Sequence, residues 1–199
     1  MKMIGEIMVK ELVLNNRSCR GYDQKYHFTR KEMEEYIDCA RLCPSSGNVQ
    51  PLKYYIAYEE TYVTEIQKLT HWAGLLPKEE LPHKGKEPTG FVVICQDMSV
   101  NSNLNRFQKD VGIVAQTMLL LATEQGLGGC MIGDFQGGDL KKFLGIDENI
   151  QPLLVVALGK PDEEIVLTEV GADGKTAYYR DEKDIHYVPK RAIETELLN

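Results

Sequence analysis

The feature that most restricts the fold is one long apolar helix. Apolar side chains cover nearly all of its sides between Val111 and Ala122, within a helix predicted over residues 106–125 that ends at Gly126. A helix that is apolar all round must be buried all round. In a chain of 199 residues, this predicts a central helix, or one shared with a second subunit. The apolar stretch contains Gln116 and is far shorter than the roughly 20 residues that span a bilayer.

Other helices and strands alternate along the chain. Apolar spacing and β-prone runs predict helices over residues 4–14, 30–43 and 60–69, and strands over residues 53–58, 91–96 and 153–158. Thr29, followed three residues later by Glu32, fits a capping box. A hairpin turn at residues 172–175 and a β-ribbon over 177–188 complete the chain. We expect one α+β domain, residues 1–199, of three-layer α/β/α type, with a central mixed sheet and helices on both faces.

Residues 70–90 differ in composition from their neighbours. They contain Pro77, Pro82 and Pro88 together with several charges, which is typical of an exposed loop. We expect a surface excursion or lid here. Trp72 within it is a candidate for capping a substrate pocket, with simple packing as the alternative.

Charge and cysteine content bound the classes of partner. The formal net charge is −7, which disfavours nucleic acid and anionic membrane surfaces but leaves room for a local phosphate site. The cysteine count of 5 is odd and argues against a disulfide framework. Residues 1–14 mix Lys and Glu with apolar residues, so they lack the apolar core of a signal peptide. We therefore expect a cytoplasmic protein.

A basic segment, Asn16–Arg20, follows the first predicted helix. Arg17, Ser18 and Arg20 place two guanidiniums and a hydroxyl close together in sequence. Such groups hold a phosphate or a carbonyl-rich ring through paired hydrogen bonds. Taken alone, a solvated basic turn is the simpler interpretation.

A polar segment, Pro44–Pro51, joins a predicted helix to a predicted strand. Its small residues allow a backbone to approach a ligand closely, and Ser45, Ser46 and Asn48 supply donors and acceptors. A polar linker bracketed by two prolines fits the same residues equally well.

Glycines cluster over residues 126–135, after the long helix. They would let main chain run flat against a planar cofactor, although Gly126 alone is also explained as a helix C-cap. The spacing is not a dinucleotide fingerprint, because Met131 stands where a third glycine is needed. It is not a P-loop either, because no Gly-Lys-Ser/Thr follows.

A basic pair, Lys190 and Arg191, lies near the end of the chain. Two adjacent cations favour a phosphate ligand. The alternative is ordinary surface charge before a final helix.

Together, in this order and spacing, the four segments resemble the FMN-dependent nitroreductase family over nearly the whole chain. That family has an Arg-Arg-Ser-x-Arg segment, then Pro-Ser-x-x-Asn-x-Gln-Pro, then a long helix running into Gly-Leu-Gly and a small-residue strand, and a basic element near the end. The matching residues here are 16–20, 44–51, 110–135 and 190–191. The resemblance implies a nitroreductase-like fold, a homodimer with the long buried helix at its interface, FMN as cofactor, and NADPH or NADH as hydride donor.

The resemblance implies cofactor contacts for the two basic segments. Arg17 and Ser18 would reach the FMN phosphate and ribityl chain, and Arg20 the polar edge of the isoalloxazine. Lys190 and Arg191 would neutralise the phosphate. Arg180 is a lesser candidate for that task.

The two remaining segments would complete the cofactor site. The other subunit would contribute four residues: Pro44, Ser45, Ser46 and Asn48. Ile132 and Gly133 would line the ring near its reactive N5. The chain also departs from the family pattern, since Asn16 replaces the first Arg and removes one phosphate cation.

The implied function is hydride transfer from NAD(P)H to an oxidised small-molecule acceptor, such as a nitroaromatic or quinone, by a ping-pong mechanism. The flavin would perform the chemistry, without a metal or a side-chain nucleophile, and Arg20 would support the negative charge of the reduced ring. A non-catalytic flavin-binding, storage or sensor protein on the same scaffold is the alternative, because it would keep every cofactor contact. A structural dimerisation module without a ligand is a third interpretation.

Overall fold

A four-stranded sheet lies at the centre of the protein, whose structure is a computed structural model that describes residues 8–76 and 80–198. The strands are β1 (Leu52–Ala57), β2 (Gly90–Asp97), β3 (Gly128–Ile132) and β4 (Ile150–Gly159). Their order is β1-β2-β4-β3, and all three pairings are antiparallel. Ser18 adds a parallel bridge to Gly129, which makes the sheet mixed at its β3 edge.

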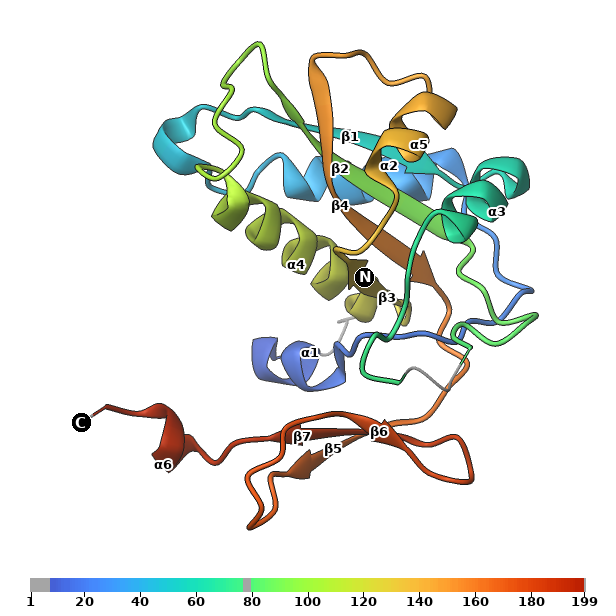
Figure 1. Ribbon diagram of the computed structural model, residues 1–199, viewed down its shortest axis with the longest axis vertical. Coiled ribbons are helices and arrows are strands. Elements are labelled where there is room, and N and C mark those ends of the chain that lie inside the picture. The colour runs from blue at the N-terminus through green and yellow to red at the C-terminus, as the bar shows by residue number, and fades with distance from the viewer. Residues whose placement is uncertain (1–7, 77–79, 199) are drawn as a thin grey trace, which may run out of the picture.

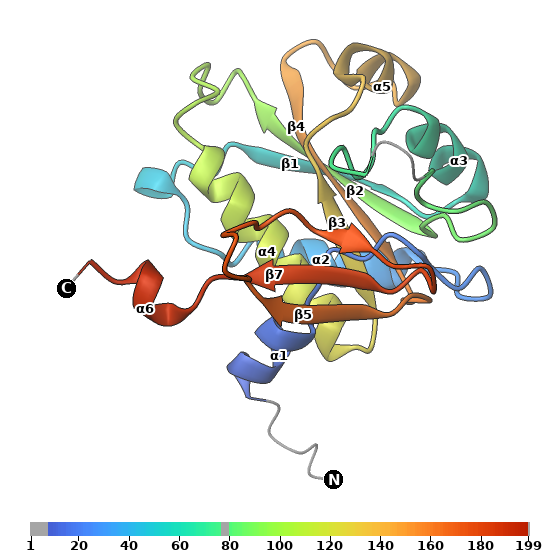
Figure 2. The ribbon, with the colours of Figure 1, turned by 60° about the horizontal axis from the view of Figure 1, so that its bottom comes forward.

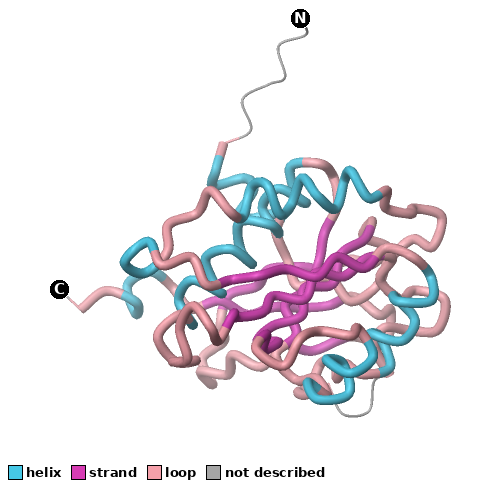
Figure 3. The backbone as a smooth tube through the Cα atoms, turned by 90° about the horizontal axis from the view of Figure 1, so that it is seen from above, coloured by secondary structure: helices cyan, strands magenta, loops and turns pink. Residues whose placement is uncertain are grey.

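Helices cover both faces of this sheet (Figures 1 and 3). The helices are α2 (Arg30–Ala40) and α4 (Gln108–Glu124) on one face, and α3 (Glu60–Lys68) and α5 (Gly137–Phe143) on the other. Alternation along β2 separates two apolar cores, with Val92 and Ile94 facing α2 and α4, and Phe91 and Val93 facing α3 and α5. This arrangement confirms the predicted three-layer α/β/α fold.

The long apolar helix predicted over residues 106–125 is α4. Val114, Ala115 and Met118 are buried against the sheet and α2. Ile113, on another side of the helix, is 39% exposed. One chain therefore does not bury this helix on all sides.

A second, three-stranded sheet packs beside α1 (Val9–Asn15), on the same side of the molecule as α4 (Figures 1 and 2). Its strands are β5 (Ile165–Glu169), β6 (Tyr179–Arg180) and β7 (His186–Lys190), in the order β5-β7-β6. The antiparallel β6–β7 pair corresponds to the predicted ribbon. The hairpin predicted at residues 172–175 is wrong: a turn occurs there, but the strands that flank it lie on opposite sides of β7, and β5 runs parallel to β7.

Several element boundaries differ from the predicted ones. Of the first predicted helix, residues 4–7 lie outside the described residues, and α1 begins at Val9. α2 ends at Ala40, three residues before the predicted end, and its Thr29–Glu32 capping box forms as predicted. Two short helical segments were not predicted, η1 (Ser46–Asn48) and α5, whereas α6 (Ile193–Glu196) lies where the surface-charge alternative for Lys190 and Arg191 expected a final helix. Among the helices described, none has the length and apolar character needed to cross a membrane.

Candidate functional site

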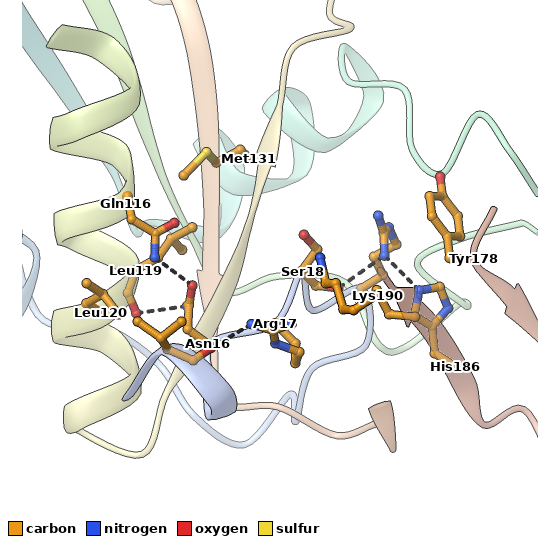
Figure 4. A pocket seen from close by; sticks show the side chains of 13 residues that line it. Asn16, Arg17, Ser18, Gln116, Leu119, Leu120, Met131, Tyr178, His186 and Lys190 are labelled. Carbon is orange, nitrogen blue, oxygen red and sulfur yellow. Dashed lines mark hydrogen bonds between the residues drawn. The ribbon is translucent and has the colours of Figure 1, made fainter. Parts of the chain in front are cut away.

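A pocket of about 590 Å³ lies between α4, the Asn16–Arg20 segment and β7 (Figure 4). Arg17, Arg20 and Lys190 all line it, and the lining residues within the described chain include no carboxylate. The formal charge of the whole chain is −7, so this positive charge is a local concentration. A ligand with an anionic group is the natural occupant of such a pocket.

Arg20 is held from several directions. The residue is 9% exposed. Its Nη1 donates a hydrogen bond to the Ser18 carbonyl oxygen at 3.1 Å and lies 3.3 Å from His186 Nε2. Its backbone N–H donates to the Glu163 carboxylate, and its guanidinium carbon lies 5.0 Å from the centroid of the Tyr178 ring. The guanidinium therefore has a fixed place in the pocket wall.

The strand β7 supplies the opposite wall by simple alternation. His186, Val188 and Lys190 all line the pocket, because every second side chain of a strand points to the same face. Arg191 does not line it, and its nearest carboxylate is that of Glu196, at 3.9 Å. Of the predicted basic pair, the structure thus brings only Lys190 to the other cations.

His186 is buried between two cations. It is 1% exposed, and burial together with the charges of Arg20 and Arg180 lowers its pKa to about 4, so the imidazole is neutral at pH 7. Both Nη atoms of Arg180 contact carboxylates, those of Glu163 and, at 2.7 Å, of Asp184, whereas its Nε is buried without a partner in the described chain. Arg180, the lesser candidate for the phosphate, is not among the residues that line the pocket, and it lies behind the wall through its bond to Glu163.

Apolar side chains form another part of the pocket wall. Leu119 and Leu120 come from α4, and Met131 comes from β3. Ile132, the next residue, is 4% exposed and packs into the core on the other face of the sheet. Gly133 follows β3 and is exposed. The side chain that β3 contributes to the pocket is thus that of Met131.

Asn16, which departs from the family pattern, binds α4. Its Nδ2 donates to the Leu119 carbonyl oxygen at 3.2 Å and to Thr123 Oγ1 at 3.1 Å. Its Oδ1 accepts from Gln116 Nε2 at 3.0 Å, and Gln116 lines the pocket. Asn16 therefore fixes the basic segment to the helix and orients Gln116.

The predicted polar segment lies at the other end of α4. Asp110, 3% exposed, accepts from Ser45 Oγ at 2.7 Å and from the backbone and hydroxyl of Ser46, both at 2.9 Å. Burial opposes ionisation of this carboxyl, but these hydrogen bonds outweigh it and lower its pKa. Asp110 and Leu120 are separated by about 15 Å along the helix, at 1.5 Å per residue. Accordingly, the pocket of the same chain is not lined by these four residues: Pro44, Ser45, Ser46 and Asn48.

Sequence reasoning did not single out several residues that the structure places in or behind the pocket. They are Gln116, Met131, Glu163, Tyr178 and His186. For His186 a signal existed, because it alternates with Val188 and Lys190 along a predicted ribbon. For Glu163 none existed, because its partner Arg180 is distant in sequence.

Comparisons with known proteins agree with this fold and pocket. The chain is 28% identical over 192 residues to an oxygen-insensitive NADPH nitroreductase of Helicobacter pylori strain 26695, covering 80% of this chain and 90% of that protein. It is 26% identical to an NADPH-flavin oxidoreductase of Vibrio harveyi, covering 77% of this chain and 65% of that one. An FMN-dependent nitroreductase of Clostridium difficile R20291 has a similar structure, with a TM-score of 0.61, 19% identity, and coverage of 77% of this chain and 87% of that one.

The three-layer α/β/α scaffold and the cationic pocket beside its long helix define an α+β protein with a site for an anionic ligand. The model of the nitroreductase family matches residues 13–160, well over half of the chain. The chain belongs to the nitroreductase family, as the sequence predicted. The match includes Asn16–Arg20 and β3, and it ends before the second sheet, which carries His186 and Lys190.

Proposed function

We propose that the protein is a cytoplasmic, homodimeric, FMN-dependent oxidoreductase. It transfers hydride from NADPH or NADH to an oxidised small molecule, such as a nitroaromatic or quinone, by a ping-pong mechanism. The observation that carries the proposal is the convergence of Arg17, Arg20 and Lys190 on one pocket without a lining carboxylate in the described chain. Relatives named as an NADPH nitroreductase and an NADPH-flavin oxidoreductase support the same class of reaction.

The pocket fits FMN, which joins an anionic phosphate to a large planar ring. Nη2 of Arg20 forms no hydrogen bond to the described residues and is not among their buried unpartnered atoms, so the pocket wall holds a donor that a polar ligand would satisfy. Leu119 and Met131 offer an apolar surface to a ring. A mostly apolar cavity with a few convergent charges is typical of a cofactor site.

Each site residue that the sequence predicted has an assigned contact in the proposed complex. Arg17 and Ser18 hold the phosphate and ribityl chain, with Lys190 as the second cation. Ile132 and Gly133 approach the ring through main chain, because the Ile132 side chain lies in the core on the other face of the sheet. Arg191 acts on the phosphate from outside the pocket wall.

Arg20 gives the electrostatic support. Bound FMN supplies the hydride acceptor and donor at N5. Arg20 places a fixed positive charge at the edge of the ring that becomes negative on reduction, and its contacts keep it there without reorganisation. The nicotinamide and the acceptor would use the same open face of the pocket in turn, which is the physical basis of a ping-pong order.

A homodimer completes the site in this proposal. None of the residues of α1 is buried, and Val9 and Val13 are 71% and 47% exposed. Ile113 on α4 is also exposed. A second copy that covers these apolar side chains would bring Pro44, Ser45, Ser46 and Asn48 of one subunit to the cofactor of the other, since these residues do not line the pocket of their own chain.

The excursion at residues 70–90 acts as a lid in this proposal. Leu75 N donates to the Tyr178 hydroxyl at 3.4 Å, and His83 Nε2 lies 3.1 Å from Asp184 Oδ2. The excursion thus contacts the second sheet beside Tyr178, which lines the pocket. Its shape would select the acceptor.

The first experiment is the visible absorption spectrum of the purified protein before and after anaerobic addition of NADPH, and then of NADH. We expect a flavin spectrum that bleaches. A flavin spectrum that persists with both donors would favour the non-catalytic flavin-binding alternative. A colourless protein that stays colourless with added FMN would overturn the proposal.

The Arg20→Ala variant tests the assigned contact. We expect the FMN Kd to rise about tenfold, equivalent to 1.4 kcal/mol, with slower flavin reduction in stopped flow. The matched control is Arg30→Ala, since the Arg30 side chain is 69% exposed on α2. Equal FMN affinity and equal reduction rate in Arg20→Ala and the wild type would contradict the role of Arg20.

A further inference from the structure

We propose that His186 is a positioning residue for Arg20: its imidazole accepts a hydrogen bond at Nε2 and so leaves Nη2 of the guanidinium free for the cofactor. The inference rests on the proposed function, and it deepens that function by assigning a residue of β7. His186 lies outside residues 13–160, the part of the chain that the family model matches. It is therefore a feature of this chain and not of the matched family segment.

The hydrogen bonds of Arg20 leave one group for a ligand. Nη1 is used by the Ser18 carbonyl oxygen at 3.1 Å and by His186 Nε2 at 3.3 Å. Nε is buried without a partner in the described chain. Nη2 forms no hydrogen bond to the residues described and is not among the sealed polar atoms. Nη2 is thus the donor that remains for the polar edge of a bound ring.

The contact with Arg20 fixes the protonation state of His186. A guanidinium has donors but no acceptor, so in this contact Nε2 accepts and the imidazole proton resides on Nδ1, which is buried without a partner in the described chain. A protonated imidazole could not accept, and it would face the charges of both Arg20 and Arg180, with Asp184 the opposing carboxylate. Burial and these cations hold the pKa of His186 near 4. The acceptor is therefore present at pH 7.

Tyr178 restrains Arg20 and His186 together. Its ring centroid lies 5.0 Å from the Arg20 guanidinium carbon and 5.2 Å from the His186 ring centroid. A cation over an aromatic face is attracted to it. The guanidinium is consequently held by the Tyr178 ring and by two acceptors at Nη1, the Ser18 carbonyl oxygen and His186 Nε2, and loss of the imidazole removes one of these acceptors.

Two substitutions separate positioning from simple packing. In His186→Gln the side-chain oxygen reaches the place of Nε2, whereas in His186→Asn the shorter amide reaches only the place of Nδ1. We expect His186→Gln to keep most of the FMN affinity, and His186→Asn to raise the FMN Kd about tenfold and to lower the flavin midpoint potential. FMN Kd is measured by fluorescence titration, and thermal melting checks that both variants fold. The matched control is His27→Asn, because His27 is exposed.

A double-mutant cycle completes the test. If His186 acts through Arg20, His186→Asn has no further effect on FMN Kd in the Arg20→Ala background. Additive effects, or equal loss in His186→Gln and His186→Asn, would overturn the inference. Failure of the proposed function is a distinct outcome, in which the wild type itself does not bind FMN. If the wild type binds and Arg20→Ala weakens binding while His186→Asn does not, only the positioning role is lost.

Discussion

The central sheet and the second sheet are stabilised by different kinds of contact. β2 is buried along nearly its whole length and is covered by apolar side chains on both faces. β5 is half-buried from Ile165 to Thr168 and exposed at Glu169, and the Glu163–Arg180 ion pair beside it has both side chains only 3% exposed. Burial of apolar area builds the scaffold, since it is strong and non-directional. Directional hydrogen bonds and ion pairs fix the second sheet, which carries the pocket wall. There the orientation of the side chains matters more than the volume that they fill.

The largest effect should come from the central sheet. Phe91→Ala removes a fully buried ring from the core between β2, α3 and α5, and we expect it to lower the free energy of unfolding by about 3–5 kcal/mol. Urea denaturation measures it. Phe143→Ala is the control, since Phe143 is 37% exposed. A loss below about 1 kcal/mol for Phe91→Ala would break the comparison, because the scaffold would then not depend on this core.

The next effect tests the ion pair of the second sheet. Arg180→Leu leaves the buried Glu163 carboxylate without its partner, and we expect a loss of about 3 kcal/mol in unfolding free energy. The double variant Arg180→Leu/Glu163→Leu should recover part of this loss, because no unpaired charge remains. Lys175→Ala is the control, since its pair with Asp173 is exposed. A double variant less stable than Arg180→Leu would show that Glu163 matters more for its bond to the Arg20 backbone.

A further effect depends on pH. It tests the second sheet without any change in side-chain volume. The pKa of His186 falls from its ordinary value of 6.5 to about 4 on folding, so between these values the unfolded chain binds a proton that the folded chain does not. Stability should therefore decrease as pH falls from about 6.5 to 4, by on the order of 2 kcal/mol, and this contribution should level off below that range. Unfolding curves of the wild type, His186→Gln and the exposed His27→Gln control measure it. Parallel curves for the wild type and His186→Gln would contradict the burial of a neutral imidazole.

The smallest effect is local to the scaffold. Thr29 Oγ1 accepts from the Glu32 backbone N–H at 3.3 Å, and Glu32 Oε2 accepts from the Thr29 backbone N–H at 2.7 Å. We expect Thr29→Ala to cost about 1 kcal/mol of stability and to leave FMN affinity unchanged. Thr64→Ala on exposed α3 surface is a comparison without a cap. A change in FMN Kd for Thr29→Ala would show that the two regions are coupled.

The same division explains how much of the fold could be predicted from the sequence. β2, β4 and α4 were predicted because each contains a continuous apolar run, and such a run is stable only when it is buried. The parallel pairing of β5 with β7 could not be predicted, because β5 is half-buried and its register depends on contacts distant in sequence, such as Glu163 with Arg180. α5 was missed because its seven residues begin with two glycines and bury only Leu140.

For the candidate site, the positive charge of the pocket could be predicted from the sequence, but the orientations of the individual side chains could not. Arg17, Arg20 and Lys190 do converge on one pocket, as a shared anionic ligand requires. Arg191 follows the last residue of β7 and does not line the pocket. Similarly, Met131 and not Ile132 presents its side chain to the pocket. A one-residue difference along a strand reverses the face, so composition alone cannot settle such assignments.

The pocket joins residues 16–20 to residues 186–190, which are separated by nearly the whole length of the chain. During synthesis the scaffold residues emerge before the second sheet does, and domains generally fold in that order. If the proposed site is correct, cofactor loading waits until residue 190 has left the ribosome, and an incomplete chain has a folded core without a complete pocket. In this proposal, synthesis from the N-terminus lets the scaffold form before the chain can bind the flavin.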